Sequence, residues 1–165
     1  MAERKESESR RTTVQKTSER EVVVTRTFDA PARLVFEAWS KPELFRKWWV
    51  PRSMGMTLRS CEMDVRSGGK YRLVFGDDPA NTMAFFGRYL EVVPDKRIVW
   101  TNEESGDAGS VTTVTLEERD GKTLLVLSEL YPSKEALDEA GTGAQDAMQE
   151  TFVQLDELLS ELCAR

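Results

Sequence analysis

Hydrophobic and polar residues alternate with a period of two over much of the chain, a pattern typical of strands with one buried face. The first such stretch, 20–28, is rich in valine and threonine and predicts a strand. Further strands are predicted at 56–65, 70–75, 82–93, 97–102, 111–118 and 122–130, with turn-forming residues between them. Gly87 lies inside one of these strands, where a glycine often marks a bulge or a close approach of another backbone.

Two segments between the first and second predicted strands follow helical spacing instead. Pro31 and Pro42 each suit the first turn of a short helix, and Pro51 ends the second helix. The hydrophobic stripe of the first helix is Leu34, Val35, Ala38 and Trp39, and that of the second is Leu44, Phe45, Trp48 and Trp49. Each stripe predicts one buried side. The adjacent tryptophans are therefore expected to be core residues or the rim of a pocket, with core packing favoured for each.

A long amphipathic helix is predicted at about 133–162, where hydrophobic residues recur every three or four positions. Gly141 and Gly143 each cost about 1 kcal/mol relative to alanine, so the helix either bends there or begins after them. The order of elements predicts an α+β fold: a curved antiparallel sheet of about six to seven strands, two short helices after the first strand, and a helix across one face. Such a sheet can keep its other face in water, which agrees with the hydrophobic content of 39%.

Composition limits the class of protein further. The first twenty residues contain only Met1, Ala2 and Val14 as apolar positions, so 1–19 is expected to be a disordered tail before one domain at 20–165. The tail lacks the hydrophobic segment of a signal peptide, and no apolar run is long enough to predict a membrane span. Cys61 and Cys163, without a CxxC motif, are expected to be buried or unreactive thiols in a reducing cytoplasm.

Histidine is absent from the sequence, and this excludes several kinds of active site. Serine and cysteine triads with histidine, HExxH zinc sites and histidine proton shuttles are all impossible. Any catalysis would depend on Tyr, Glu, Asp, Lys, Arg or Cys. The sequence indicates no metal site and no cofactor.

Four segments in order carry a resemblance to a known family: RTFDAPARLVFEAWSKPELFRKWWVP, RSGGKYRLVF, FFGRYLEVVPDKRIVWT and TFVQLDELLSEL. Together they resemble the homologues of the activator of the heat-shock-protein-90 ATPase, within the START/SRPBCC superfamily of helix-grip domains. The resemblance covers roughly 22–162. It implies a cavity between the long helix and the concave face of the sheet, where relatives hold lipids, polyketides, hormones or other apolar molecules. Some relatives carry out aromatase or cyclase chemistry.

The chain differs from the relatives that it resembles at two positions, and both differences make the expected cavity more polar. Relatives often have a tryptophan where this chain has Asn102, and many have a histidine where it has Glu129. The strand faces that carry Tyr71, Trp100, Asn102 and Glu129 would then place a few polar groups in an apolar lining, as in small-molecule sites. The expected ligand-binding residues are Trp39, Trp48, Trp49, Tyr71, Leu73, Phe75, Phe85, Trp100, Asn102, Val114, Leu127, Glu129, Met148 and Phe152. No catalytic residue is assigned.

Some of these features have plainer alternatives. Glu129 either faces the cavity or lies at a strand end in water, and both remain open. Glu91 is expected on the outer face, paired with an arginine or solvated. The run from Ser67 to Lys70 resembles the end of a Walker A motif, which needs a glycine three residues before the run and a serine or threonine directly after it. These positions hold Asp64 and Tyr71, so the run predicts a turn instead.

Nucleic-acid binding is not expected. Seven basic residues lie between Arg46 and Arg72, but strand alternation spreads them over different faces and no RNP-type aromatic motif accompanies them. The whole chain has a net charge of −6 and an isoelectric point near 4.9.

We therefore expect a cytoplasmic helix-grip domain that binds a small, largely apolar ligand and does not insert into a membrane. Two alternatives remain open. One is a chaperone-associated, stress-response module that uses an exposed apolar surface rather than the cavity. The other is a cyclase or hydratase with Glu129 and Tyr71 as an acid/base pair. Binding is favoured over catalysis.

Overall fold

The computed structural model describes residues 12–103 and 109–164, and within them eight antiparallel strands form one sheet. The sheet order is β1-β2-β8-β7-β6-β5-β4-β3. The strands are β1 (Thr13–Lys16), β2 (Glu21–Phe28), β3 (Leu58–Met63), β4 (Lys70–Phe75), β5 (Met83–Val93), β6 (Arg97–Thr101), β7 (Val111–Arg119) and β8 (Lys122–Leu130). The α+β class is confirmed, and each of the seven predicted strands forms within two residues of its expected bounds.

β1 was not expected, because it lies in the segment predicted as a disordered tail. Thr13–Lys16 pairs antiparallel with β2, from Thr13 opposite Thr25 to Lys16 opposite Val22. The free edge of β2 offers unpaired backbone groups, and bonding to them does not require apolar side chains. A tail running to residue 19 is therefore a wrong boundary; residues 1–11 of that segment lie outside the described residues.

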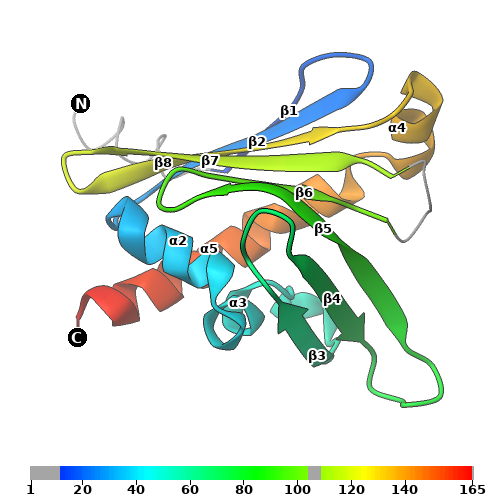
Figure 1. Cartoon of the computed structure of the whole chain (residues 1–165), viewed down its shortest axis with the longest axis horizontal. Coiled ribbons are helices and arrows are strands. Elements are labelled where there is room, and N and C mark those ends of the chain that lie inside the picture. The colour runs from blue at the N-terminus through cyan, green and yellow to red at the C-terminus, as the bar shows by residue number, and fades with distance from the viewer. Residues whose placement is uncertain (1–11, 104–108, 165) are drawn as a thin grey trace.

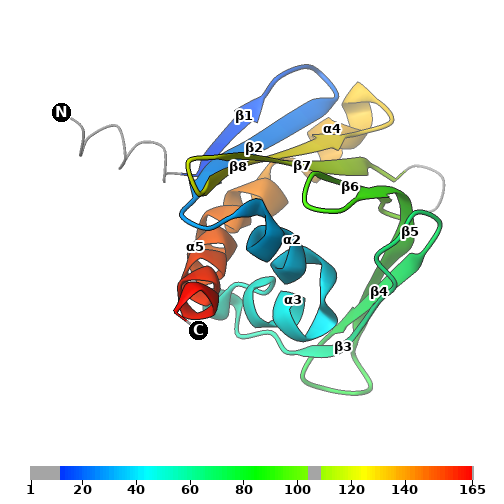
Figure 2. The same ribbon diagram turned by 60° about the vertical axis from the view of Figure 1, so that its left-hand side comes forward.

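The helices are α2 (Ala32–Ser40), α3 (Pro42–Trp48), the 3₁₀ turn η1 (Arg52–Met54), α4 (Lys134–Ala140) and α5 (Gly143–Cys163). The α2, α3 and α5 helices lie on the concave side of the sheet, and α4 lies at its edge (Figures 1 and 2). Figure 2 shows β3, β4 and β5 turned away from the plane of β1, β2, β8 and β7, so that the sheet curls around α2, α3 and α5. None of the helices in the described part of the chain is long and apolar enough to span a bilayer.

The predicted C-terminal helix is two helices rather than one. Ser133 caps α4 by accepting a hydrogen bond from the Ala136 N–H at 3.1 Å. The α4 helix ends at Gly141, whose φ of +68° is the left-handed region that glycine adopts without strain. The α5 helix starts directly afterwards. The two glycines therefore separate a short helix at the edge of the sheet from the long helix that crosses it.

Two contacts anchor α5 to the sheet. The Arg26 guanidinium on β2 forms a salt bridge with Asp156 on α5 at 2.9 Å, although Arg26 itself is buried. Phe28 and Phe152 pack edge to face, with ring centroids 5.5 Å apart. Between them these contacts hold the middle of α5 against the concave face, at the end of the sheet where α2 also packs.

Gly87 confirms the predicted close approach of a second backbone. A Cβ at this position would lie 2.0 Å from the Thr101 carbonyl oxygen of β6. The register between β5 and β6 shifts two residues later, between Tyr89 and Glu91. This irregularity lies where the sheet bends, and β-bulges increase local twist and curvature. Gly87 thus permits the bend that separates β3–β5 from the rest of the sheet.

Candidate ligand-binding cavity

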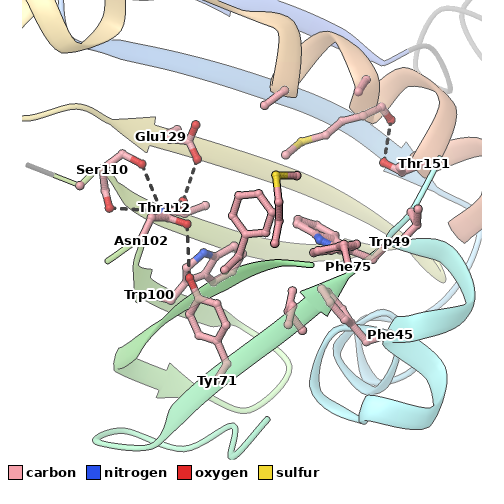
Figure 3. Close-up of a pocket in the computed structure, with 18 of the residues that line it drawn as sticks. Phe45, Trp49, Tyr71, Phe75, Trp100, Asn102, Ser110, Thr112, Glu129 and Thr151 are labelled. Carbon is pink, nitrogen blue, oxygen red and sulfur yellow. Dashed lines mark hydrogen bonds between the residues drawn. The ribbon is translucent and has the colours of Figure 1, made fainter. Parts of the chain in front are cut away.

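The curled sheet and the helices enclose a cavity of about 820 Å³. This volume lies in the range of about 300–1,000 Å³ that is usual for small-molecule pockets. The wall is built by the concave face of β3 to β8, by α2, α3 and η1, and by the facing sides of α4 and α5. Most of the lining is apolar or aromatic, and most of the polar side chains gather at one end, with Thr151 on the other side near Trp49 (Figure 3).

The aromatic part of the wall comes from segments far apart in the sequence. The Trp49 indole stacks on the Phe45 ring, with centroids 4.8 Å apart and planes 27° from parallel. The Trp39 indole lies 5.7 Å from that of Trp49 and 5.9 Å from that of Trp100 on β6. Aromatic rings in such tilted and stacked arrangements form a rigid surface with few rotatable bonds. This surface suits a flat or cyclic apolar molecule.

The polar part is a chain of hydrogen bonds across the ends of neighbouring strands (Figure 3). The Tyr71 hydroxyl donates to the Thr101 carbonyl at 2.7 Å and lies 3.3 Å from the Asn102 Oδ1 atom. The Asn102 amide donates to the Thr112 hydroxyl at 2.9 Å and to the Ser110 carbonyl and hydroxyl at 3.1 Å each. Thr112 then donates to Glu129 Oε1 at 3.0 Å.

Glu129 is the end of this chain and accepts hydrogen bonds at both carboxylate oxygens. The Tyr131 hydroxyl donates to Oε2 at 2.8 Å, and the Gln145 amide of α5 donates to the same oxygen. The Gln145 amide also donates to the Tyr131 hydroxyl at 3.0 Å. Burial, and secondly the charge of Glu129, raises the pKa of the Tyr131 phenol to about 12, so this group remains a donor at neutral pH.

The register of the sheet explains this convergence. Trp100 pairs with Thr112 on β7, and Thr112 pairs with Glu129 on β8. Directly paired residues in neighbouring strands point to the same face, so all three side chains reach the concave side. Of the two alternatives for Glu129, the structure favours the inward one, because its side chain lines the cavity and is half-buried.

Ten of the fourteen expected ligand-binding residues line the cavity: Trp39, Trp49, Tyr71, Leu73, Phe75, Phe85, Trp100, Asn102, Glu129 and Met148. Their contact with a ligand stays a prediction. The other four, Trp48, Val114, Leu127 and Phe152, do not line it and are fully buried. Val114 and Leu127 do face the concave side, but α2 and α5 cover that end of the sheet, so these residues pack against helices instead of open space.

The tryptophan pair divides between the two expected roles. Trp48 is fully buried, and its indole N–H donates to the Ala38 carbonyl at 2.9 Å, which fastens α3 to α2. Trp49 is half-buried and lines the cavity. Core packing is therefore correct for Trp48, and the pocket wall is the better description of Trp49.

The remaining sequence features have structural roles outside the cavity. Glu91 is exposed on the outer face and forms a salt bridge with Arg97 at 3.4 Å, as expected. The run beginning at Ser67 forms the predicted turn between β3 and β4. Burial raises the pKa of the Cys61 thiol, in agreement with an unreactive cysteine. Cys163 is exposed in the last turn of α5, so burial was the wrong expectation there. No cluster of metal-binding side chains occurs within 12–103 and 109–164.

Several lining residues were missed by the sequence reasoning. Tyr131 and Gln145 complete the bonds to Glu129, but neither lies in a clear strand or in the main stripe of a helix. Small residues on the facing sides of α4 and α5 leave the space open: Ala136, Ala140, Ala144 and Ala147. Their spacing of three or four residues is visible in the sequence, although a stripe of alanines predicts close helix packing as readily as a cavity.

Gln154 was also missed, and it positions the wall that carries Trp49. Its amide donates to the carbonyls of Trp48 at 3.0 Å and Val50 at 2.8 Å, and its Oε1 accepts from the Arg52 N–H at 2.9 Å. Near it, Glu150 accepts from the backbone N–H of Ser53 at 2.9 Å. The α5 helix thereby holds the connection from α3 to η1 in place.

Solved structures with the same fold come from several bacteria. A protein from Rhodobacter sphaeroides is 24% identical, with a TM-score of 0.80 over 92% of this chain and 99% of that one. Protein NE0264 from Nitrosomonas europaea is 25% identical, with a TM-score of 0.77 over 91% and 100% of the two chains. Protein CV1439 from Chromobacterium violaceum is 27% identical, with a TM-score of 0.71 over 86% and 98%.

Among curated proteins, none matches the sequence. The family model described as "Activator of Hsp90 ATPase homolog 1-like protein" matches residues 29–160, which extend from the start of α2 nearly to the end of α5. The match agrees with the helix-grip architecture and with the four resembling segments. The chain therefore belongs to the family of activator of Hsp90 ATPase homologue 1-like proteins.

Proposed function

We propose that the protein binds a small, largely apolar molecule in the cavity between the sheet and the α4 and α5 helices. The observation that carries this proposal is the open volume of about 820 Å³ behind an aromatic wall. Protein interiors are close-packed and contain few voids larger than a water molecule. A space of this size, largely apolar and with most of its polar groups at one end, has the composition of a ligand site rather than of a packing defect.

The residues opposite the aromatic wall support the same proposal. Ala140, Ala144 and Ala147 present only methyl groups where leucine or methionine would fill the space. Elsewhere on α5, large side chains such as Phe152 and Leu155 pack fully against the core. The change from large to small residues along one helical face coincides with the cavity.

The two alternative functions receive less support. Of the nine large apolar side chains that are exposed in the described residues, Met54, Met83 and Phe85 line the cavity and belong to its mouth rather than to a separate patch for a chaperone. The other six are divided among β5, β8 and α5. For catalysis, Tyr71 and Glu129 would have to converge on one reacting group. Instead, Tyr71 bonds to Asn102 and Glu129 bonds to Thr112, so the Asn102–Thr112 hydrogen bond lies between the two groups.

The test is the melting temperature in the presence of a panel of lipids and aromatic polyketides, with native mass spectrometry to detect bound molecules. A ligand at 100 times its Kd stabilises the folded state by about 2.7 kcal/mol. For a chain of this size that corresponds to a rise in Tm of roughly 5–10 °C.

A matched pair of variants locates the binding. Ala147→Trp places a large side chain in the cavity and is expected to abolish the rise in Tm. Val153→Trp adds the same side chain to α5 at a position that is 49% exposed and outside the lining, and it should leave the rise unchanged. The proposal fails if no compound in the panel binds, or if Ala147→Trp binds as tightly as the unmodified protein.

A further inference from the structure

The charged groups in the cavity wall all have the same sign. Among the described residues that line it, only Glu129 and Glu139 are charged, and neither lysine nor arginine is present. Glu129 lies half-buried at the polar end, and Glu139 is exposed on α4. A bound molecule would therefore meet negative charge only.

The hydrogen bonds of Glu129 satisfy its oxygens without neutralising its charge. The donors are Thr112, Tyr131 and Gln145, and all three are neutral. Within the described ranges, no basic side chain forms a salt bridge with Glu129. Carboxylates removed from water are usually paired with a cation, because desolvation of an unpaired charge is costly.

The arginines on nearby strands are engaged elsewhere. Arg88 on β5 forms a salt bridge with Glu103 at 3.0 Å, and Arg97 on β6 forms one with Glu91 at 3.4 Å. Arg52, beside the mouth, forms one with Glu157 on α5 at 2.8 Å. Arg20 lies near the polar end, but its guanidinium donates to the Tyr131 backbone carbonyl at 3.0 Å. Glu129 is therefore the carboxylate that a ligand would face at the polar end of the cavity.

We propose that the ligand is an amine, whose ammonium group donates to Glu129 and whose apolar, preferably cyclic, body lies against Trp39, Trp49 and Trp100. This inference rests on the proposed function and narrows it to one class of ligand. A charge-assisted hydrogen bond to a carboxylate is about twice as strong as one between neutral groups. Aromatic faces also attract cations. Fatty acids and phosphate-bearing lipids would instead bring a like charge to Glu129.

The test compares three molecules of similar size that differ in head group: naphthalen-1-ylmethylamine, naphthalen-1-ylmethanol and 1-naphthoate. Isothermal titration calorimetry at pH 7.5 and low salt is expected to rank them amine, alcohol, acid. The amine should bind at least about tenfold more tightly than the acid, since like charges in an interface disfavour binding strongly. The preference should weaken as salt screens the charges.

Glu129→Gln removes the charge and keeps a similar shape, so it is expected to lower the amine-to-acid affinity ratio by about tenfold while the alcohol is little affected. Glu91→Gln makes the same change of net charge on the outer face and should leave the ratio unchanged.

Tighter or equal binding of naphthoate by the unmodified protein, with the alcohol still bound, overturns the amine assignment but not the cavity. Binding of none of the three, when a compound of the wider panel does bind, also overturns it. Failure of every compound overturns the proposed function itself. The ranking in the unmodified protein decides the question even if Glu129→Gln does not fold.

Discussion

Trp48 and Trp49 are adjacent in the sequence, yet they contact different parts of the molecule. The Trp48 side chain is fully buried between α2, α3 and α5, and its N–H bonds to Ala38. The Trp49 side chain stacks on Phe45 and faces the cavity (Figure 3). Consecutive helical residues point about 100° apart, so one side chain enters the core while its neighbour reaches the adjoining open space.

Replacing each tryptophan separates the two roles. Trp48→Ala is expected to lower the free energy of unfolding by about 3–5 kcal/mol, because it leaves a large cavity in packed surroundings and an unpaired carbonyl. Trp49→Ala should cost about half of that or less, because its side chain already borders open space. Urea denaturation measures both values. Equal losses would contradict the division, as would a Trp49→Ala protein that binds ligand as tightly as the unmodified one.

At the scale of elements, the cavity depends on how α5 holds the segment between α3 and β3. Gln154 bonds to three backbone groups of this segment, and Glu150 and Arg52 add further contacts across the same junction. Buried backbone groups that lose their partners are costly. A glutamine on the buried side of a helix would otherwise be unfavourable, and these bonds explain its presence.

Gln154→Leu is expected to lower the free energy of unfolding by at least about 2 kcal/mol, since it leaves two carbonyls and one N–H of the α3–η1 connection unpaired. Gln149→Leu makes the same substitution at an exposed position on the same helix and should change stability by less than about 0.5 kcal/mol. Guanidinium chloride titrations of the two variants provide the comparison. Similar midpoints for both would show that Gln154 contributes no more than a surface residue.

The whole molecule has an unusual distribution of titrating groups. It contains no histidine, so the side-chain type that ordinarily titrates near neutral pH is missing. Hydrogen bonds from the hydroxyls of Ser128, Thr101 and Ser53 lower the pKa values of Glu21, Glu103 and Glu150, respectively. At the alkaline end, burial raises the pKa of Tyr131 to about 12.

Stability is therefore expected to be nearly constant from pH 6 to 8 and to fall at both extremes. In acid, carboxyls of lowered pKa take up protons more readily in the unfolded chain, so stability decreases as the pH falls below about 4.5. In base, the unfolded phenol ionises near pH 10 while folded Tyr131 keeps its proton, so stability decreases from about pH 10 towards 12.

Thermal unfolding followed by circular dichroism between pH 3 and 11.5 measures this profile. Tyr131→Phe should reduce the alkaline decrease without changing the acid one, because it removes one of two phenols whose pKa burial raises; Tyr89 is the other and accounts for the decrease that remains. A stability maximum with steep slopes inside the range from pH 6 to 8 would contradict the expectation.

Much of the fold could be predicted from local patterns. The alternation at 70–75, 111–118 and 122–130 indicated both the strands and the face that each buries, because the side-chain period of a strand is two. Pro31 and Pro42 located the starts of two helices, and Gly141 with Gly143 marked a break in the third. The pairing of β1 with β2 was not predictable in this way, since backbone bonding at a sheet edge leaves little trace in side-chain composition.

The candidate site was predictable only in part. Sequence reasoning expected Tyr71, Trp100 and Asn102 on the concave face, where the structure has them, because strand alternation is a local property. It left Glu129 open between that face and water, and the structure has its side chain in the cavity wall. It did not distinguish Leu73, which borders the cavity, from Leu127, which α2 and α5 cover. That difference depends on where helices distant in the sequence cross the sheet.

The sequence by itself thus determined the α+β class, the strand faces and the absence of histidine chemistry, all of which follow from residue type and spacing. Only the tertiary structure decided which part of the concave face stays open, that Tyr131 and Gln145 complete the bonds to Glu129, and that no described basic side chain lines the wall. The physical reason is that a cavity is a property of packing: it exists where elements of fixed shape meet without filling the space between them, and no local pattern encodes that remainder.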